Sequence, residues 1–153
     1  MSQIEAGSIY VADEFFRPKT ESAWREAKSD KTQQNRPRVL VVDDQKLIVD
    51  TIAEILEGAG FHVMPAYDGW TALEVASRFR PDFLLSDVLM PRMNGMELAI
   101  AIRKMHPGAR ILLFSGQAGI SEIIHEGKRQ GFEFELVAKP IHPLKLIELL
   151  KEK

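Results

Sequence analysis

The stretch Asp82-Phe83-Leu84-Leu85-Ser86-Asp87 is an apolar run that ends in a carboxylate, and the same pattern recurs along the chain. Three other apolar runs end in residues that can carry chemistry. They are Val39 to Val42 before Asp43-Asp44, Ile111 to Phe114 before Ser115, and Leu136 to Ala138 before Lys139-Pro140. Short, continuously apolar runs are typical of β-strands that helices cover on both faces.

Amphipathic stretches alternate with these runs. We expect strands near 38–43, 61–65, 82–87, 110–115 and 134–138, and helices near 45–59, 69–79, 95–105, 119–130 and 143–152. In the first helix, Ile48, Ile52, Ile55 and Ala59 fall on one face, and Gly58 and Gly60 are expected to end it. Regular alternation with short connections predicts an α/β fold with a doubly wound parallel sheet. Right-handed crossovers then bring every loop that follows a strand to one rim.

The acidic residues at this rim favour a divalent cation. Asp43, Asp44 and Asp87 can offer carboxylate oxygens, and the backbone carbonyl of Leu89 can add another. Mg²⁺ prefers oxygen ligands, and a cation offsets the repulsion between clustered carboxylates. Asp43-Asp44 taken alone could equally cap a helix. With all the strand ends considered together, a Mg²⁺ site is the better interpretation.

Asp87 is the candidate nucleophile, because a carboxylate can attack phosphorus and form an aspartyl phosphate. The incoming phosphoryl group is negatively charged and needs cations and donors around it. The ammonium of Lys139 and the hydroxyl of Ser115 could supply these contacts. Taken singly, Lys139 could be a solvated charge and Ser115 a strand-end cap. The sequence leaves open whether the Lys139-Pro140 peptide bond is cis.

Composition excludes several classes of function. The net charge of −2 gives no basic face for nucleic acid, and the absence of cysteine rules out disulfides and thiol chemistry. No apolar run approaches the roughly 18–20 residues that span a membrane. The first residues also lack the basic start and apolar stretch of a signal peptide. A cytoplasmic protein without direct contact with nucleic acid or membrane is therefore expected.

Residues 1–37 differ from the rest of the chain. They mix acidic, basic and polar side chains with a few large apolar ones, among them Phe15, Phe16 and Trp24. Residues 29–37 have the composition of a linker. We expect an N-terminal extension over 1–37, either flexible or a docking segment, and one folded domain over 38–153.

The motifs of residues 38–153 resemble the receiver domain of bacterial two-component response regulators. They are Val41-Val42-Asp43-Asp44, Asp87 through Gly95, Ser115-Gly116 and Lys139-Pro140. The resemblance implies a flavodoxin-like (βα)₅ fold with strand order 2-1-3-4-5. It also implies Mg²⁺-dependent phosphorylation of Asp87 by a sensor histidine kinase or a phosphotransfer protein. Asp43 and Asp44 would help bind Mg²⁺, while Ser115 and Lys139 would read the phosphorylated state for a downstream protein target.

The chain departs from the family's usual pattern in two ways. The family usually has Tyr or Phe three residues before the Lys-Pro lysine, whereas this chain has Leu136, and neither Phe132 nor Phe134 aligns with that position. We also expect no output domain after the receiver pattern. The chain therefore resembles stand-alone receivers, such as chemotaxis regulators and phosphorelay intermediates, and phosphorylation-dependent homodimerisation stays open.

Two other functions compete with this interpretation. Leu136 and the N-terminal extension favour a receiver-fold binding module that does not use phosphorylation, but the complete acid cluster argues against it. A small Mg²⁺-dependent phosphohydrolase would need a second acid two residues after Asp87, where Leu89 stands. We therefore expect a signalling protein that accepts a phosphoryl group, rather than an enzyme that turns over free substrates.

Overall fold

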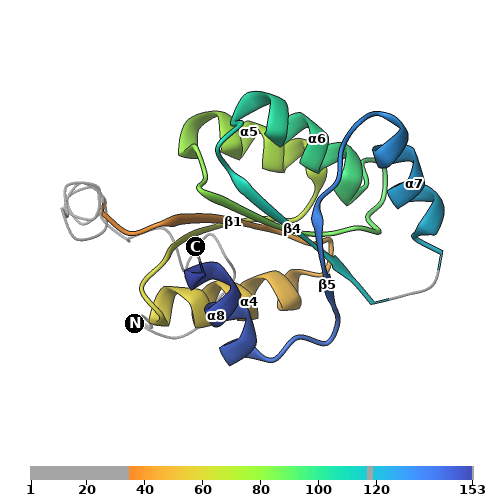
Figure 1. Cartoon of the computed structure of the whole chain (residues 1–153). Helices are drawn as coiled ribbons and strands as arrows, with labels where there is room; N and C mark the ends of the chain where they lie inside the picture. Colours follow the sequence, from red (N-terminus) through yellow and green to blue (C-terminus); the bar gives the residue numbers. More distant parts are fainter. Residues whose placement is uncertain (1–34, 117–118, 153) are drawn as a thin grey trace.

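The computed structural model describes residues 35–116 and 119–152. Five parallel strands form one sheet in the order β2-β1-β3-β4-β5, so the predicted fold class and strand order are confirmed (Figure 1). In chain order the elements are β1 (Arg38–Val42), α4 (Lys46–Gly58), β2 (His62–Ala66), α5 (Gly69–Phe79), β3 (Phe83–Asp87), α6 (Gly95–Met105), β4 (Arg110–Ser115), α7 (Ser121–Arg129), β5 (Glu135–Ala138) and α8 (Pro143–Lys151).

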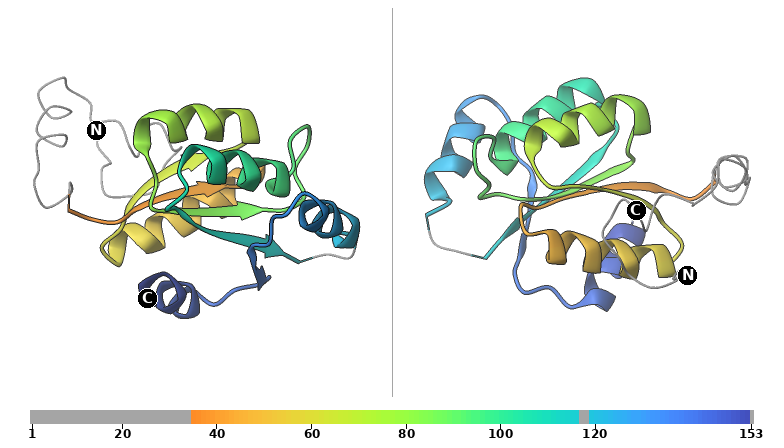
Figure 2. Two further views of the ribbon diagram at one scale, coloured as in Figure 1. Left: turned by 45° about the horizontal axis from the view of Figure 1, so that its top comes forward. Right: turned by 180° about the vertical axis from the view of Figure 1, so that it is seen from behind.

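Helices cover both faces of the sheet. Helices α5, α6 and α7 lie on one face, and α4 and α8 lie on the other (Figures 1 and 2). Each layer has its own apolar core, centred on Leu84 and Leu113 for the first and on Leu85 and Leu112 for the second. Alternate residues of β3 and β4 thus point to opposite cores, which explains why these strands are apolar throughout.

The boundaries fall within two residues of the predicted ones, because local signals set them. Gly60 adopts a positive φ of 101°, which lets the chain turn after α4 as predicted. Helix α6 begins with a capping box, in which the Asn94 side chain accepts from the Glu97 amide and the Glu97 side chain accepts from the Asn94 amide. Pro143 occupies the first turn of α8, as expected.

Asp82 joins three strands at the edge of the sheet opposite the predicted site. Its amide donates to the Arg38 carbonyl at 2.8 Å, and its side chain accepts from the Arg38 amide at 2.8 Å. Its carbonyl accepts from the Arg110 amide at 2.9 Å. These bonds fix the register of β1, β3 and β4, so the carboxyl ends of these strands reach the opposite edge together.

Most of the predicted N-terminal extension, residues 1–37, lies outside the described residues, so its character and the domain boundary stay predictions. Among residues 35–116 and 119–152, no helix has the length and apolar character that crossing a bilayer requires.

His62, at the start of β2, should make the stability of the fold depend on pH. Burial lowers its pKa from the ordinary value of 6.5, and the charges of Arg38 and Arg36 lower it further. The lowered pKa means that folding disfavours the protonated ring. The contribution of His62 to the free energy of unfolding is therefore present above the pKa that the residue has in the unfolded chain, and it is lost as the pH falls below that value. Urea unfolding between about pH 7.5 and about pH 5.5 should show a smaller loss of stability in His62→Gln than in wild type.

The matched control is His125→Gln, because His125 is exposed on α7. An unchanged pH dependence in His62→Gln, or an equal reduction in His125→Gln, would contradict this assignment.

Candidate functional site

Three carboxylates meet at the carboxyl ends of the central strands. Asp43 and Asp44 follow β1, and Asp87 ends β3. One carboxylate oxygen from each lies within 4.8 Å of the others. Asp43 is buried, with 2% of its surface exposed, and its Oδ1 accepts from the Gln45 amide at 2.9 Å. Asp44 is exposed, so the cluster opens to solvent on that side.

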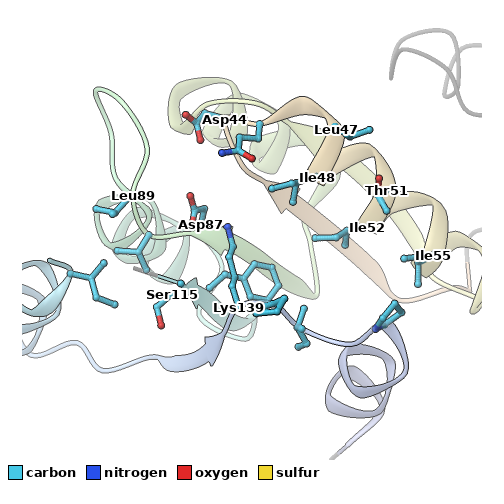
Figure 3. Close-up of a pocket in the computed structure, with 18 residues that line it drawn as sticks. Asp44, Leu47, Ile48, Thr51, Ile52, Ile55, Asp87, Leu89, Ser115 and Lys139 are labelled. Carbon is cyan, nitrogen blue, oxygen red and sulfur yellow. Dashed lines mark hydrogen bonds and ion pairs between the residues drawn. The ribbon is translucent and has the colours of Figure 1, made fainter. Parts of the chain in front are cut away.

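Lys139 connects the edge strand to this cluster. It follows β5, and its amide donates to the Ser115 carbonyl at 3.0 Å. Its Nζ lies 3.1 Å from Asp87 Oδ1 (Figure 3). The same nitrogen lies 3.2 Å from Asp43 Oδ2. The Lys139-Pro140 peptide bond, which the sequence left open, is cis. Through its two hydrogen bonds, the ammonium contacts the candidate nucleophile and a candidate metal ligand together.

Burial and charge act against each other at this site. Desolvation by burial raises the pKa of Asp87, and the negative charges of Asp43 and Asp44 raise it further. The hydrogen bond from Lys139 lowers this pKa, but the overall result is a raised pKa. Burial alone would lower the pKa of Lys139, but its hydrogen bond to Asp87 and the carboxylates of Asp43 and Asp87 raise it overall. The ammonium form is thus favoured next to carboxylates that repel one another.

The donor set fits a divalent cation of the Mg²⁺ type. The three closely spaced carboxylate oxygens are hard ligands, and one of the three residues is exposed, which leaves room for water in the coordination shell. Lys139 offsets only part of the negative charge. Leu89 and Ser115, the other predicted site residues, line the same pocket as Asp44, Asp87 and Lys139. The structure thus brings all the predicted site residues to one rim, while their roles stay predictions.

Contacts to the backbone of Asp87 and Val88 hold Asp87 in place. The Ser86 hydroxyl donates to the Asp87 carbonyl at 2.9 Å, and the Gly95 amide donates to the Val88 carbonyl at 2.8 Å. A Cβ on Gly95 would overlap the carbonyl oxygen of Asp87 and lie 2.9 Å from the Cα of Val88. Gly95 is therefore needed because the start of α6 packs directly on the backbone of the candidate nucleophile.

Gly116 has a structural role that the sequence did not reveal. A Cβ at this position would lie 2.9 Å from the Cβ of Lys139. The absent side chain lets the aliphatic stem of Lys139 pass close to the end of β4. The small residue directly after Ser115 was the available signal, but its partner is 23 positions away in the sequence and only the fold brings them together.

Leu136 and the two phenylalanines before it take separate positions. Leu136 lies on β5 with 47% of its surface exposed. The Phe132 and Phe134 rings stack on each other with centroids 6.1 Å apart, and the Arg103 guanidinium lies 5.7 Å from the Phe134 centroid. Neither phenylalanine lies on β5. The departure at Leu136 therefore leaves an exposed aliphatic side chain where the family usually has an aromatic one.

The comparisons with known proteins agree with this geometry. A family model described as the response regulator receiver domain matches residues 39–151. The chain belongs to this family of receiver domains from two-component response regulators.

Individual relatives match over the same region. The chemotaxis protein CheY of Thermotoga maritima is 32% identical over 119 residues, which cover 75% of this chain and 95% of the relative. The regulatory protein VanRc of Enterococcus gallinarum is 32% identical over 114 residues, or 74% of this chain and 48% of VanRc, so the chain spans about half the length of that relative. The structure of chemotaxis protein CheY4 of Vibrio cholerae superposes with a TM-score of 0.67 at 30% identity, covering 76% of this chain and 97% of CheY4.

Proposed function

We propose that the protein accepts a phosphoryl group on Asp87 from a phosphohistidine carried by a sensor histidine kinase or a phosphotransfer protein. A carboxylate oxygen of Asp87 attacks phosphorus as the phosphorus–nitrogen bond breaks, and the donor histidine is released. The observation that carries this proposal is the position of Lys139, whose ammonium hydrogen-bonds both Asp87 and Asp43 in a cluster of three acids. Membership in the receiver family supports it.

Each residue at the rim has a proposed part in the transfer. Asp43, Asp44 and Asp87, with the Leu89 carbonyl, would hold Mg²⁺, which would supply positive charge to the phosphoryl oxygens. Lys139 would turn from the Asp87 carboxylate to a phosphoryl oxygen, and Ser115 would donate to another. Because Asp87 ends as an acyl phosphate that stays covalently attached to the protein, the chain acts as a signalling phosphoprotein rather than as an enzyme acting on free substrates.

The phosphorylated state would then be read by a downstream protein target. We propose that the contacts of Ser115 and Lys139 with the phosphoryl group shift β4 and β5, and that the target binds the shifted surface. Two further expectations accompany this proposal: a cytoplasmic location, and homodimerisation that depends on phosphorylation.

The proposal is tested by intact mass after incubation with acetyl phosphate, with Mg²⁺ or with excess EDTA. We expect one added phosphoryl group in the presence of Mg²⁺ and none after chelation, because the carboxylates alone repel the donor. Transfer from a phosphorylated histidine kinase tests the natural type of donor. If neither donor labels the protein in Mg²⁺, the proposal fails.

Lys139→Ala should separate phosphorylation from its structural consequence. The acids remain, so a reduced but measurable phosphoryl adduct is expected. The contact that ties the phosphoryl group to β5 is lost. Hydrogen–deuterium exchange of residues 135–141 should therefore change on phosphorylation in wild type but not in Lys139→Ala. Lys145→Ala, which removes an exposed lysine from α8, is the control and should behave like wild type. Equal exchange changes in wild type and Lys139→Ala would refute this role.

A phosphorylation-independent binding module is the second candidate. The exposed Leu136 favours it, because an aliphatic side chain cannot move a polar ring between buried and exposed states. Under this alternative, Asp87→Asn would leave affinity for the downstream partner unchanged.

A further inference from the structure

A largely apolar groove runs from the candidate site along α4. It has a volume of about 860 Å³, and Asp87 and Lys139 lie at one end. Figure 3 shows Ile48, Ile52 and Ile55 of α4 pointing toward the segment that connects β5 to α8. The opposite wall includes Pro140, Ile141 and Pro143.

The groove presents apolar surface to solvent. Leu47, which also lines it, is 79% exposed, and nothing in the part of the chain that the structure describes covers it. Contiguous exposed apolar surface of this kind marks a site where another segment or molecule binds.

The described chain begins beside the far end of this groove. The Pro37 carbonyl accepts from the His62 amide at 2.9 Å, and the next amide, that of Val63, donates to Glu57 at 3.0 Å. Glu57 lies in the last turn of α4, two residues after Ile55 of the groove. The residues that precede Asn35 in the sequence therefore join the fold next to the Ile55 end of the groove.

The preceding sequence carries large apolar side chains suited to this groove. Tyr10, Phe15, Phe16 and Trp24 fall within residues 1–34, where acidic and basic side chains are closely balanced. Ten residues separate Trp24 from Asn35. Fully extended, they span up to about 33 Å, whereas the part of α4 from Leu47 to Ile55 is only about 12 Å long. Reach therefore does not limit contact between Trp24 and any part of the groove.

We propose that the groove is the binding site for this chain's own N-terminal segment, residues 9–28, with the aromatic side chains seated against Ile48, Ile52 and Ile55. Attachment beside the groove gives the segment a high effective concentration there, which favours it over a free partner of equal intrinsic affinity. The bound segment lies next to Asp87 and Lys139. The proposal concerns docking alone and does not depend on the phosphorylation of Asp87.

The test uses tryptophan fluorescence in the full chain. The chain has two tryptophans, Trp24 and Trp70, and Trp70 is 63% exposed on α5, so Trp70→Phe leaves Trp24 as the single reporter with little cost to folding. We expect blue-shifted emission and a several-fold lower acrylamide quenching constant than in the same protein unfolded in urea. Adding Thr51→Arg or Leu47→Arg, which place a charge in the groove at exposed positions, should remove both effects. Ser77→Arg, at an exposed position of α5 on the other face of the sheet, should not.

Four results would overturn the proposal. Trp24 could be quenched in the folded protein as readily as in urea. Its protection could survive both Thr51→Arg and Leu47→Arg, or be lost equally in Ser77→Arg, which would place Trp24 elsewhere. Protection that disappears on dilution would identify the occupant as the same segment of a second copy of the chain.

Discussion

Asp87→Asn should reduce phosphoryl incorporation from acetyl phosphate to the detection limit. The amide oxygen is a poor nucleophile, and the substitution also removes one of the three carboxylates proposed to hold Mg²⁺. Asparagine keeps the size of the side chain, so the packing at the end of β3 should persist. Intact mass in Mg²⁺ and acetyl phosphate measures the effect directly.

The control for Asp87→Asn is Glu54→Gln. Glu54 is an exposed carboxylate on α4 that does not line the groove or the acid cluster, so its neutralisation should leave incorporation at the wild-type level. An adduct that persists in Asp87→Asn would show that another carboxylate accepts the phosphoryl group. Fragmentation after borohydride reduction would then identify it.

Gly95→Ala should destabilise the protein and impair phosphorylation in one step. The new Cβ would overlap the Asp87 carbonyl oxygen and lie 2.9 Å from the carbonyl carbon, so either α6 or the backbone of Asp87 has to move. Both contacts are with backbone, which cannot rotate away as a flexible side chain can. Overpacking of this kind costs about 1–3 kcal/mol, and we expect a loss at the upper end of that range. Urea unfolding measures the loss, and the initial rate of Asp87 phosphorylation should fall with it.

Gly108→Ala is the matched control for Gly95→Ala. No atom lies within 4 Å of the Cβ position at Gly108, in the turn between α6 and β4. Its stability should therefore stay near wild type or rise by up to about 1 kcal/mol through reduced freedom of the unfolded chain. If Gly95→Ala matched Gly108→Ala in stability, the close packing of α6 on Asp87 would not be rigid.

The central strands were predictable because each carries a continuous apolar run that ends in a distinctive residue. The sequence of β3, from Phe83 to Asp87, predicted both a strand and a candidate site residue at its end. Its partners followed from topology, since parallel strands gather their carboxyl ends at one edge. The meeting of Asp43, Asp87 and Lys139 is thus a consequence of strand order that the sequence anticipated.

Contacts between side chains that are far apart in the sequence were harder to predict. The bidentate pair between Arg110 and Glu135, with nitrogen–oxygen distances of 2.8 and 3.0 Å, joins β4 to β5 but involves two ordinary surface residue types. Arg80 and Arg92 adopt positive φ angles of 54° and 69°, which no sequence rule for arginine predicts. The groove beside α4 was also not predictable, because its apolar residues are indistinguishable in sequence from those that pack in a core.

The acids and the lysine of the site come from strands that differ in burial and in the number of neighbouring strands. Asp43 and Asp87 extend from β1 and β3, which have neighbours on both sides in the sheet and are largely buried. Lys139 extends from β5, which has a single neighbouring strand and three exposed residues out of four. A force applied between the acids and the lysine would therefore displace the outer strand and leave the inner ones still. Strand β5, which also carries Leu136, is therefore the side of the site that we expect to move, while β1 and β3 stay in place.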